Sequence, residues 1–208
     1  GCCGGGGVGG VGWGGGGGGV WRAQDFESQK NYNEDKKNTR KKCRNMAKKI
    51  YYAQQEWQND HYYLGVTDAG LAFVGSANQS IEELKNWYPQ AQLEASEKKT
   101  APYKEALISY LNQHSTTFAC PIDIEGTPFQ KEVWQALQEI PYGETMTYQE
   151  ISEKIGRPRA VRAVGTAIGK NPLLMVIPCH RVIGSKGQLT GYRGGLAMKQ
   201  ALLTFEQS

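Results

Sequence analysis

The stretch TYQEISEKIGRPRAVRAVGTAIG, residues 147–169, contains the signals for two short helices joined by a tight turn. Thr147 and Glu150 form a capping box, which predicts a helix start at this point. Gly156 ends that helix, and a second helix is expected over residues 159–168. Two short helices with a glycine-containing turn are typical of a helix-turn-helix, in which the second helix recognises DNA.

The second of these helices consists mostly of small residues. Its long polar side chains are Arg159 and Arg162, so it has few groups that could read base edges in a major groove. The composition favours close approach to a backbone or a minor groove over sequence readout. A helix that is merely tightly packed would look the same, so this signal does not decide the matter alone.

A third helix is predicted just before this stretch, at the start of a unit that begins with Gly126. Thr127 and Gln130 form another capping box, and the helix should run as far as Pro141. Apolar residues repeat along it at helical spacing: Phe129, Val133, Trp134, Leu137 and Ile140. This helix is expected to face the core.

A candidate nucleophile follows the helix-turn-helix. Residues 173–177 are apolar and predict a short buried strand that Pro178 ends. Cys179 would then lie at the end of this strand, next to His180 and close to Arg181, where its thiolate could be stabilised. The alternative is that Cys179 is a small core residue, which is the more common role of a free cysteine.

The basic residues are concentrated near the C-terminus. The net charge is only +4, but no aspartate or glutamate occurs from Lys154 to Phe205. The other basic residues of that span are Arg157, Arg159, Arg162, Lys170, Arg181, Lys186, Arg193 and Lys199. Such a span predicts a polyanionic partner, with a solvated basic face as the alternative.

The chain before Met46 has no core pattern. Residues 1–20 are almost entirely glycine, and the following residues up to 45 are polar and rich in lysine. Residues 1–45 are therefore predicted to be a disordered tail. We interpret this tail as sequence upstream of a natural start at Met46, with a nonspecific nucleic-acid-binding tail as the alternative.

Residues 46–122 predict a small α/β domain. Strand patterns occur at 49–54, 61–66 and 70–75 and read as a meander. Two helices follow at 80–87 and 102–113, with Pro102 in the first turn of the second helix. The remainder, residues 126–208, forms the second predicted domain.

The cysteines and histidines do not suggest cross-links or a metal. There are 5 cysteines, an odd number without the spacing of a disulfide framework, which indicates reduced thiols in an intracellular compartment. Four residues that could bind zinc do not fall into a ligand spacing: Cys43, Cys120, His61 and His114. We expect no metal and no cofactor.

The succession Pro178-Cys179-His180-Arg181-Val182 resembles the active-site signature of the O6-alkylguanine-DNA alkyltransferases, or methylated-DNA-protein-cysteine methyltransferases. The likeness is continuous from about 127 to 206 and fainter from Met46. Other stretches that resemble family segments, in the family's order, are 129–137, 141–151, 162–165, 171–172 and 191–199. The resemblance implies an N-terminal ribonuclease-H-like α/β domain and a mainly helical, winged helix-turn-helix-like DNA-binding domain that carries the cysteine.

The resemblance also implies roles at the reactive centre. Cys179 would be the alkyl acceptor, His180 would link it through a water to Glu206, and Asn171 would support the surrounding loop. A free thiol with a pKa of about 8.5 is only a few per cent ionised at neutral pH. A histidine–carboxylate relay that removes the proton would therefore supply the nucleophile.

The expected substrate is double-stranded DNA that contains O6-alkylguanine, with O4-alkylthymine left open. By resemblance, Arg162 fills the gap left by a rotated base, and Tyr148 crowds the phosphate and then donates its hydroxyl to the flipped guanine. Backbone groups of Cys179, Val182 and Arg193 would bind the base edge. The remaining DNA-binding or substrate-binding residues on this reading are Thr147, Gln149, Arg157, Ser185 and Tyr192. The protein would act once, as a monomer, in the cytoplasm or in a eukaryotic nucleus.

Two positions depart from the family's pattern. Arg193 stands where many relatives have a small residue and Leu174 where some have proline, and both bear on the width of the pocket.

Two other functions compete with alkyl transfer. A lesion sensor or a helix-turn-helix regulator would bind DNA without transferring an alkyl group, but such sensors replace the nucleophile. A cysteine hydrolase normally has its histidine far from its cysteine in sequence.

Overall fold

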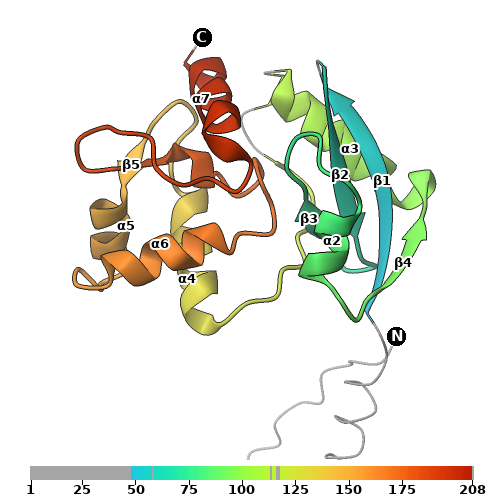
Figure 1. Ribbon diagram of the computed structural model, residues 1–208, viewed down its shortest axis with the longest axis horizontal. Coiled ribbons are helices and arrows are strands. Elements are labelled where there is room, and N and C mark those ends of the chain that lie inside the picture. The colour runs from blue at the N-terminus through green and yellow to red at the C-terminus, as the bar shows by residue number, and fades with distance from the viewer. Residues whose placement is uncertain (1–47, 58, 113, 116–117, 208) are drawn as a thin grey trace, which may run out of the picture. The chain divides into compact units, whose positions relative to one another are not determined.

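The computed structural model describes residues 48–57, 59–112, 114–115 and 118–207 (Figure 1). The predicted tail of residues 1–45 and the predicted start at Met46 lie outside these residues. No helix in the described ranges is long and apolar enough to cross a membrane.

The N-terminal part contains a four-stranded mixed sheet. Its strands are β1 (Lys49–Trp57), β2 (Asp60–Val66), β3 (Leu71–Val74) and β4 (Gln92–Ala95). The order is β3-β2-β1-β4, and the first three strands form the antiparallel meander predicted from the sequence. β4 was not predicted. It runs parallel to β1, with Lys49 opposite Gln92, so it needs the intervening helix as a crossover.

The two faces of the sheet pack against different helices. Leu84 of α2 (Glu82–Trp87) packs with Ile50 and Phe73. Leu107 of α3 (Glu97–Leu111) belongs to the larger core, which contains the β2 side chain Leu64. On β3, Phe73 enters the first cluster and its neighbour Val74 the second, since successive residues of a strand point to opposite faces.

The position of Pro102 in α3 corrects a prediction. The helix begins at Glu97, because the Ser96 side chain accepts a hydrogen bond from the Lys99 backbone and caps it. Pro102 therefore lies inside the helix and not in its first turn. The prediction placed the start of the helix at Pro102, whereas the Ser96 cap places it at Glu97.

The C-terminal part is mainly helical, as predicted (Figure 1). Its helices are α4 (Pro128–Gln138), α5 (Tyr148–Lys154), α6 (Val161–Gly169), a 3-10 turn η1 (Cys179–Arg181) and α7 (Gly195–Glu206). Both predicted capping boxes, at Thr127 and Thr147, are confirmed. α6 begins at Val161, slightly later than expected. A short parallel pair, β5 (Met146–Thr147) with β6 (Val182–Ile183), ties the start of α5 to the segment after η1.

Residues 173–177 are buried as predicted, apart from the partly buried Val176, but they do not form a strand. They form a tight turn in which only Leu173 makes a sheet-like bridge, to Val74 of β3. Met175 has a φ of 69°, in the left-handed region that strands exclude. The prediction for this apolar run was therefore correct about its burial and wrong about its strand conformation.

One core joins the parts of the described chain. It contains Leu64 from the sheet, Val133 from α4 and Ile177 from the loop before Cys179. The Trp134 Nε1 atom donates to the Ala167 carbonyl at 2.9 Å, which links α4 to α6. The helix-turn-helix therefore rests on the same core as the reactive loop.

The cap of α4 allows a direct test of this architecture. Thr127→Ala removes the hydroxyl that accepts from the Gln130 backbone, and we expect a loss of about 1 kcal/mol in the free energy of unfolding. Thr127→Ser keeps the oxygen and should lose much less. Urea denaturation of the three proteins measures both values, and equal losses for Ala and Ser would contradict the capping role.

Candidate active site

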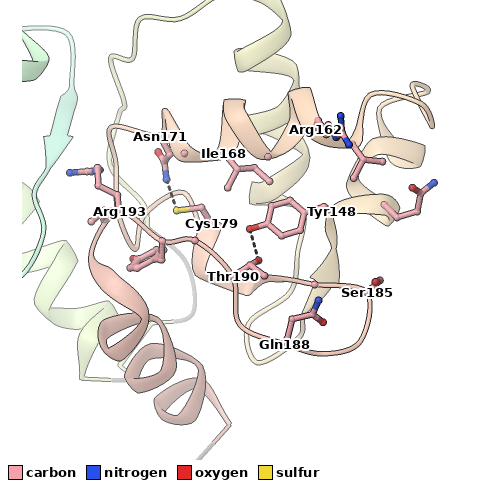
Figure 2. Close-up of a pocket in the computed structure, with 17 residues that line it drawn as sticks. Tyr148, Arg162, Ile168, Asn171, Cys179, Ser185, Gln188, Thr190 and Arg193 are labelled. Carbon is pink, nitrogen blue, oxygen red and sulfur yellow. Dashed lines mark hydrogen bonds between the residues drawn. The ribbon is translucent and has the colours of Figure 1, made fainter.

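Cys179 lies at the start of η1 and lines a pocket of about 860 Å³. The thiol belongs to a residue that is only 4% exposed. Other pocket residues come from α5, α6 and the segment after β6, so the pocket lies between the helix-turn-helix and the C-terminal loop (Figure 2). A reacting group would have to enter from that side to reach the sulfur.

Asn171 holds the loop that presents Cys179. Its Nδ2 atom lies 3.1 Å from the Leu173 carbonyl, 2.9 Å from the Ile177 carbonyl and 3.1 Å from the Cys179 Sγ atom. Its Oδ1 atom accepts from the Leu173 backbone at 2.9 Å. One buried side chain thus replaces the ladder bonds that a strand would have provided, and it also contacts the sulfur (Figure 2).

The resemblance implies a relay through His180 and Glu206, and these two side chains are in direct contact. The His180 Nε2 atom lies 2.7 Å from Glu206 Oε1, and both side chains are almost completely buried. The other ring nitrogen, Nδ1, is buried and has no hydrogen-bond partner in the described part of the chain. Because an ionised carboxylate only accepts, Nε2 carries the hydrogen and Nδ1 has a free lone pair.

Glu206 is the most heavily bonded acid of the site. Arg181 donates to its two oxygens, from Nε at 2.8 Å and from Nη2 at 3.0 Å. The Tyr110 hydroxyl of α3 donates to Oε1, and the Gly143 backbone donates to Oε2 at 3.3 Å. These donors come from segments far apart in the chain, and they all favour the charged form of the carboxyl group.

The surroundings move the pKa values of the site in opposite directions. Burial alone would raise the pKa of Glu206, but hydrogen bonds from His180 and Arg181 outweigh it and lower the pKa to about 2. Burial lowers the pKa of His180, although Glu206 opposes this. Burial also raises the pKa of the Cys179 thiol, and the Asn171 hydrogen bond offsets it only in part. Burial therefore favours the thiol form of Cys179 over the stabilised thiolate that the sequence suggested.

The pocket wall opposite Cys179 contains Tyr148 and Thr190. The Thr190 hydroxyl lies 3.1 Å from the Tyr148 hydroxyl, which fixes the ring at the mouth of the pocket (Figure 2). Gln149, Ser185 and Tyr192 also line the pocket, as does exposed Arg162 on α6. Except for Thr190, these residues are among those assigned to DNA or substrate binding from the resemblance, and that role stays a prediction.

Three of the predicted binding residues do not line the pocket. Val182 is fully buried, and its carbonyl accepts from Lys199. Thr147 caps α5, and Arg157 forms an ion pair with Glu132 at 3.0 Å. Thr147 precedes the first residue of α5, and Arg157 lies in the turn between α5 and α6.

Comparison with known proteins decides the family. The chain is 46% identical to the inducible methylated-DNA–protein-cysteine methyltransferase of Bacillus subtilis, over 76% of this chain and 90% of that protein. The chain belongs to this family. Residues 128–208 match the family model described as 6-O-methylguanine DNA methyltransferase, DNA binding domain.

Other relatives agree in sequence and in fold. A Methanosarcina acetivorans methylated-DNA–protein-cysteine methyltransferase is 42% identical over 76% of this chain and 99% of that protein. The crystal structure of Mycobacterium tuberculosis OGT in complex with DNA has a TM-score of 0.68 and 36% identity. That match covers 76% of this chain and 93% of the solved chain. The fold predicted for a methyltransferase of this family is thereby confirmed.

Two residues that support the site were not predicted. Tyr110 lies in the N-terminal part, 96 residues before Glu206, and nothing local marks it. Lys199 is fully buried, and its Nζ donates to the Val182 and Thr190 carbonyls, the second at 2.9 Å. A lysine three residues before the apolar pair Leu202 and Leu203 is a signal that could have identified it.

The charge of the basic span is not all directed outward. Arg181 and Lys199 are buried, and Arg193 is paired with Glu83 at 2.6 Å. The other six basic residues of the span are exposed: Lys154, Arg157, Arg159, Arg162, Lys170 and Lys186. The basic face is therefore smaller than the composition suggested.

The low pKa of Glu206 predicts acid sensitivity. Between about pH 4.5 and pH 2 the unfolded state gains this proton before the folded state does, so stability should fall by about 3 kcal/mol as the pH decreases across that range. Above pH 4.5 this contribution is fully present. Glu206→Gln should be less stable at neutral pH, because Arg181 loses its partner, and should lack this part of the decline.

Chemical denaturation at several pH values between 2 and 7 measures the difference. The matched control is Glu105→Gln, which changes an exposed glutamate on α3 and should keep the wild-type profile. An acid decline in Glu206→Gln as steep as that of the wild type would show that another group is responsible.

Proposed function

We propose that this protein repairs double-stranded DNA by moving the alkyl group of O6-alkylguanine to the Cys179 sulfur, irreversibly and once per molecule. The observation that supports this most directly is the placement of Cys179 in a pocket beside a helix-turn-helix. The named relatives are methylated-DNA–protein-cysteine methyltransferases, and one solved neighbour is a complex with DNA. We propose that it acts in the cytoplasm, or in the nucleus of a eukaryote.

The proton of the thiol needs an acceptor, and His180 is suited to that role. Its Nδ1 atom is buried with no partner among the described residues, while Nε2 donates to Glu206. We infer that a water passes the Cys179 proton to Nδ1, which leaves an imidazolium beside a carboxylate. Because Glu206 has a pKa of about 2, it stays ionised and stabilises this charge.

The bond to sulfur forms as the alkyl group leaves the guanine oxygen. The sulfur attacks the alkyl carbon, an S–C bond forms and the C–O6 bond breaks with its electron pair going to the base. The guanine anion takes up one proton, which the Tyr148 hydroxyl in the pocket is placed to deliver from solvent, and the His180 imidazolium returns the thiol proton to water. The thioether has no route back to the thiol, so one molecule repairs one lesion.

The base must leave the duplex before it can reach Cys179. Rotation of a nucleotide costs a few kcal/mol, which the protein has to offset. Arg162 is exposed on α6 at the rim of the pocket, where it could take the place of the rotated base (Figure 2). The exposed basic residues of the helix-turn-helix would bind phosphates on either side.

Alkyl transfer to one cysteine can be observed directly. After incubation with an oligonucleotide that contains O6-methylguanine, the protein should gain one methyl group, mapped to Cys179 by peptide mass spectrometry. Cys179→Ser should not react but should still bind the DNA, since a hydroxyl is far less acidic than a thiol. Cys120→Ser, which changes the other free cysteine of the described chain, should react like the wild type. Binding without methylation would indicate a sensor, and multiple turnovers would indicate a different catalyst.

The role of Arg162 separates base rotation from chemistry. Arg162→Ala should slow repair of duplex DNA by at least about tenfold and slow reaction with free O6-benzylguanine much less, because the free base needs no rotation. Arg159→Ala, which also changes an exposed arginine near the start of α6, is the matched control and should affect affinity more than rate. Equal slowing of Arg162→Ala on both substrates would contradict a role in base rotation.

A further inference from the structure

Arg193 contributes to the pocket wall, but its side chain leaves the pocket. Figure 2 shows it pointing away from the pocket centre. The Nη1 atom lies 2.6 Å from Glu83 Oε1, and Nη2 donates to the Val74 carbonyl at 2.8 Å and to the Pro172 carbonyl at 3.2 Å. The guanidinium therefore binds α2, β3 and the loop that leads to Cys179.

These contacts join two walls of the pocket from behind. One wall contains Asn171, which touches the Cys179 sulfur and precedes Pro172. The other contains Tyr192 and Arg193. Because one planar group bonds to Pro172 and is attached to the second wall, the separation of the two walls depends on the length of the Arg193 side chain.

Neighbouring groups hold the Arg193–Glu83 ion pair, which we call the brace, in place. The Arg193 guanidinium lies 5.2 Å from the centroid of the Phe73 ring and 5.1 Å from that of Trp87. Its side chain is 14% exposed and that of Glu83 is 18% exposed, so water screens the pair weakly. Glu83 is itself held by Ser76, whose backbone and hydroxyl donate to it at 2.8 and 2.7 Å. The anchor is thus fixed independently of Arg193.

We propose that the Arg193–Glu83 pair is a positioning device that sets the size of the O6-alkyl group accepted by the pocket. This inference rests on the proposed alkyl transfer to Cys179. With the brace intact, the second wall cannot move away from Asn171 and Pro172, so bulky groups are disfavoured. When the brace is removed, the wall gains freedom and the penalty against bulk falls.

A competition experiment with the full chain tests this. Two duplexes of identical sequence, one with O6-methylguanine and one with O6-benzylguanine, are mixed with limiting protein, and the methylated and benzylated Cys179 peptides are compared. The product ratio reports only on reactive molecules, so loss of folded protein does not change it. Arg193→Ala should raise the benzyl-to-methyl ratio by roughly tenfold, as expected when a size restriction in a pocket is relieved.

Further variants identify the pair as the cause. Arg193→Lys keeps the charge but carries its donors on one nitrogen instead of a planar fork, so it should hold these three acceptors less well and its ratio should be intermediate. Glu83→Ala should shift the ratio in the same direction, and the double variant should not exceed Arg193→Ala by the full effect of Glu83→Ala. Lys85→Ala, which breaks an ion pair with Glu82 on the same helix, is the matched control and should keep the wild-type ratio.

The results that would contradict this proposal differ from the result that would contradict the proposed function. An unchanged or lower ratio in Arg193→Ala, even with slower reaction overall, would overturn the proposed control of size and leave a structural role. A shift of the same size in Lys85→Ala would show that any disturbance of α2 is sufficient, which also overturns it. Absence of alkylated Cys179 in the wild type with both duplexes would instead overturn the proposed function itself.

Discussion

The buried carboxylate of Glu206 is the constraint on which the reactive centre depends. A charge in the interior is costly unless it is fully bonded, and this one accepts from His180, Arg181, Tyr110 and the Gly143 backbone. These donors lie on η1, on α3 and in the loop before β5, so the fold must bring α7, η1 and α3 together to satisfy the charge. Since Cys179 is the first residue of η1, its position follows from the same requirement.

The basic character of the C-terminal part has two structural uses. A span without acids suggested a uniform surface for a polyanion, yet Arg181 and Arg193 pair with acids from outside that span, and buried Lys199 donates to backbone carbonyls. Arginine suits the first two places because its planar fork bonds to several acceptors at once. The cations that remain exposed gather at and near the helix-turn-helix, which concentrates the positive surface where a phosphate backbone would be met.

Features that depend on neighbouring residues could be predicted from the sequence, and features that depend on distant ones could not. The capping boxes at Thr127 and Thr147 join atoms three residues apart, so the helix starts they mark were recognised correctly. The apolar run at 173–177 was misread because a strand and a buried turn have the same composition, and here the Asn171 amide supplies the bonds that a neighbouring strand would have made. Cys179, His180 and Glu206 were found through the family's motif, whereas Tyr110 and Glu83 reach the site across 96 and 110 residues and leave no local signal.

The raised pKa of Cys179 fits a protein that is consumed by its own reaction. A thiolate exposed to solvent would be alkylated or oxidised by any small electrophile, and each such event would remove one molecule of repair capacity. Burial favours the protonated form of the sulfur, because water cannot stabilise the charge there. His180, the proposed acceptor for the proton, does not line the pocket, so a ligand that fills the pocket need not cover its Nδ1 atom. On the proposed mechanism, ionisation would accompany attack on the bound alkyl group instead of preceding it, which would couple the reactivity of the thiol to recognition of the lesion.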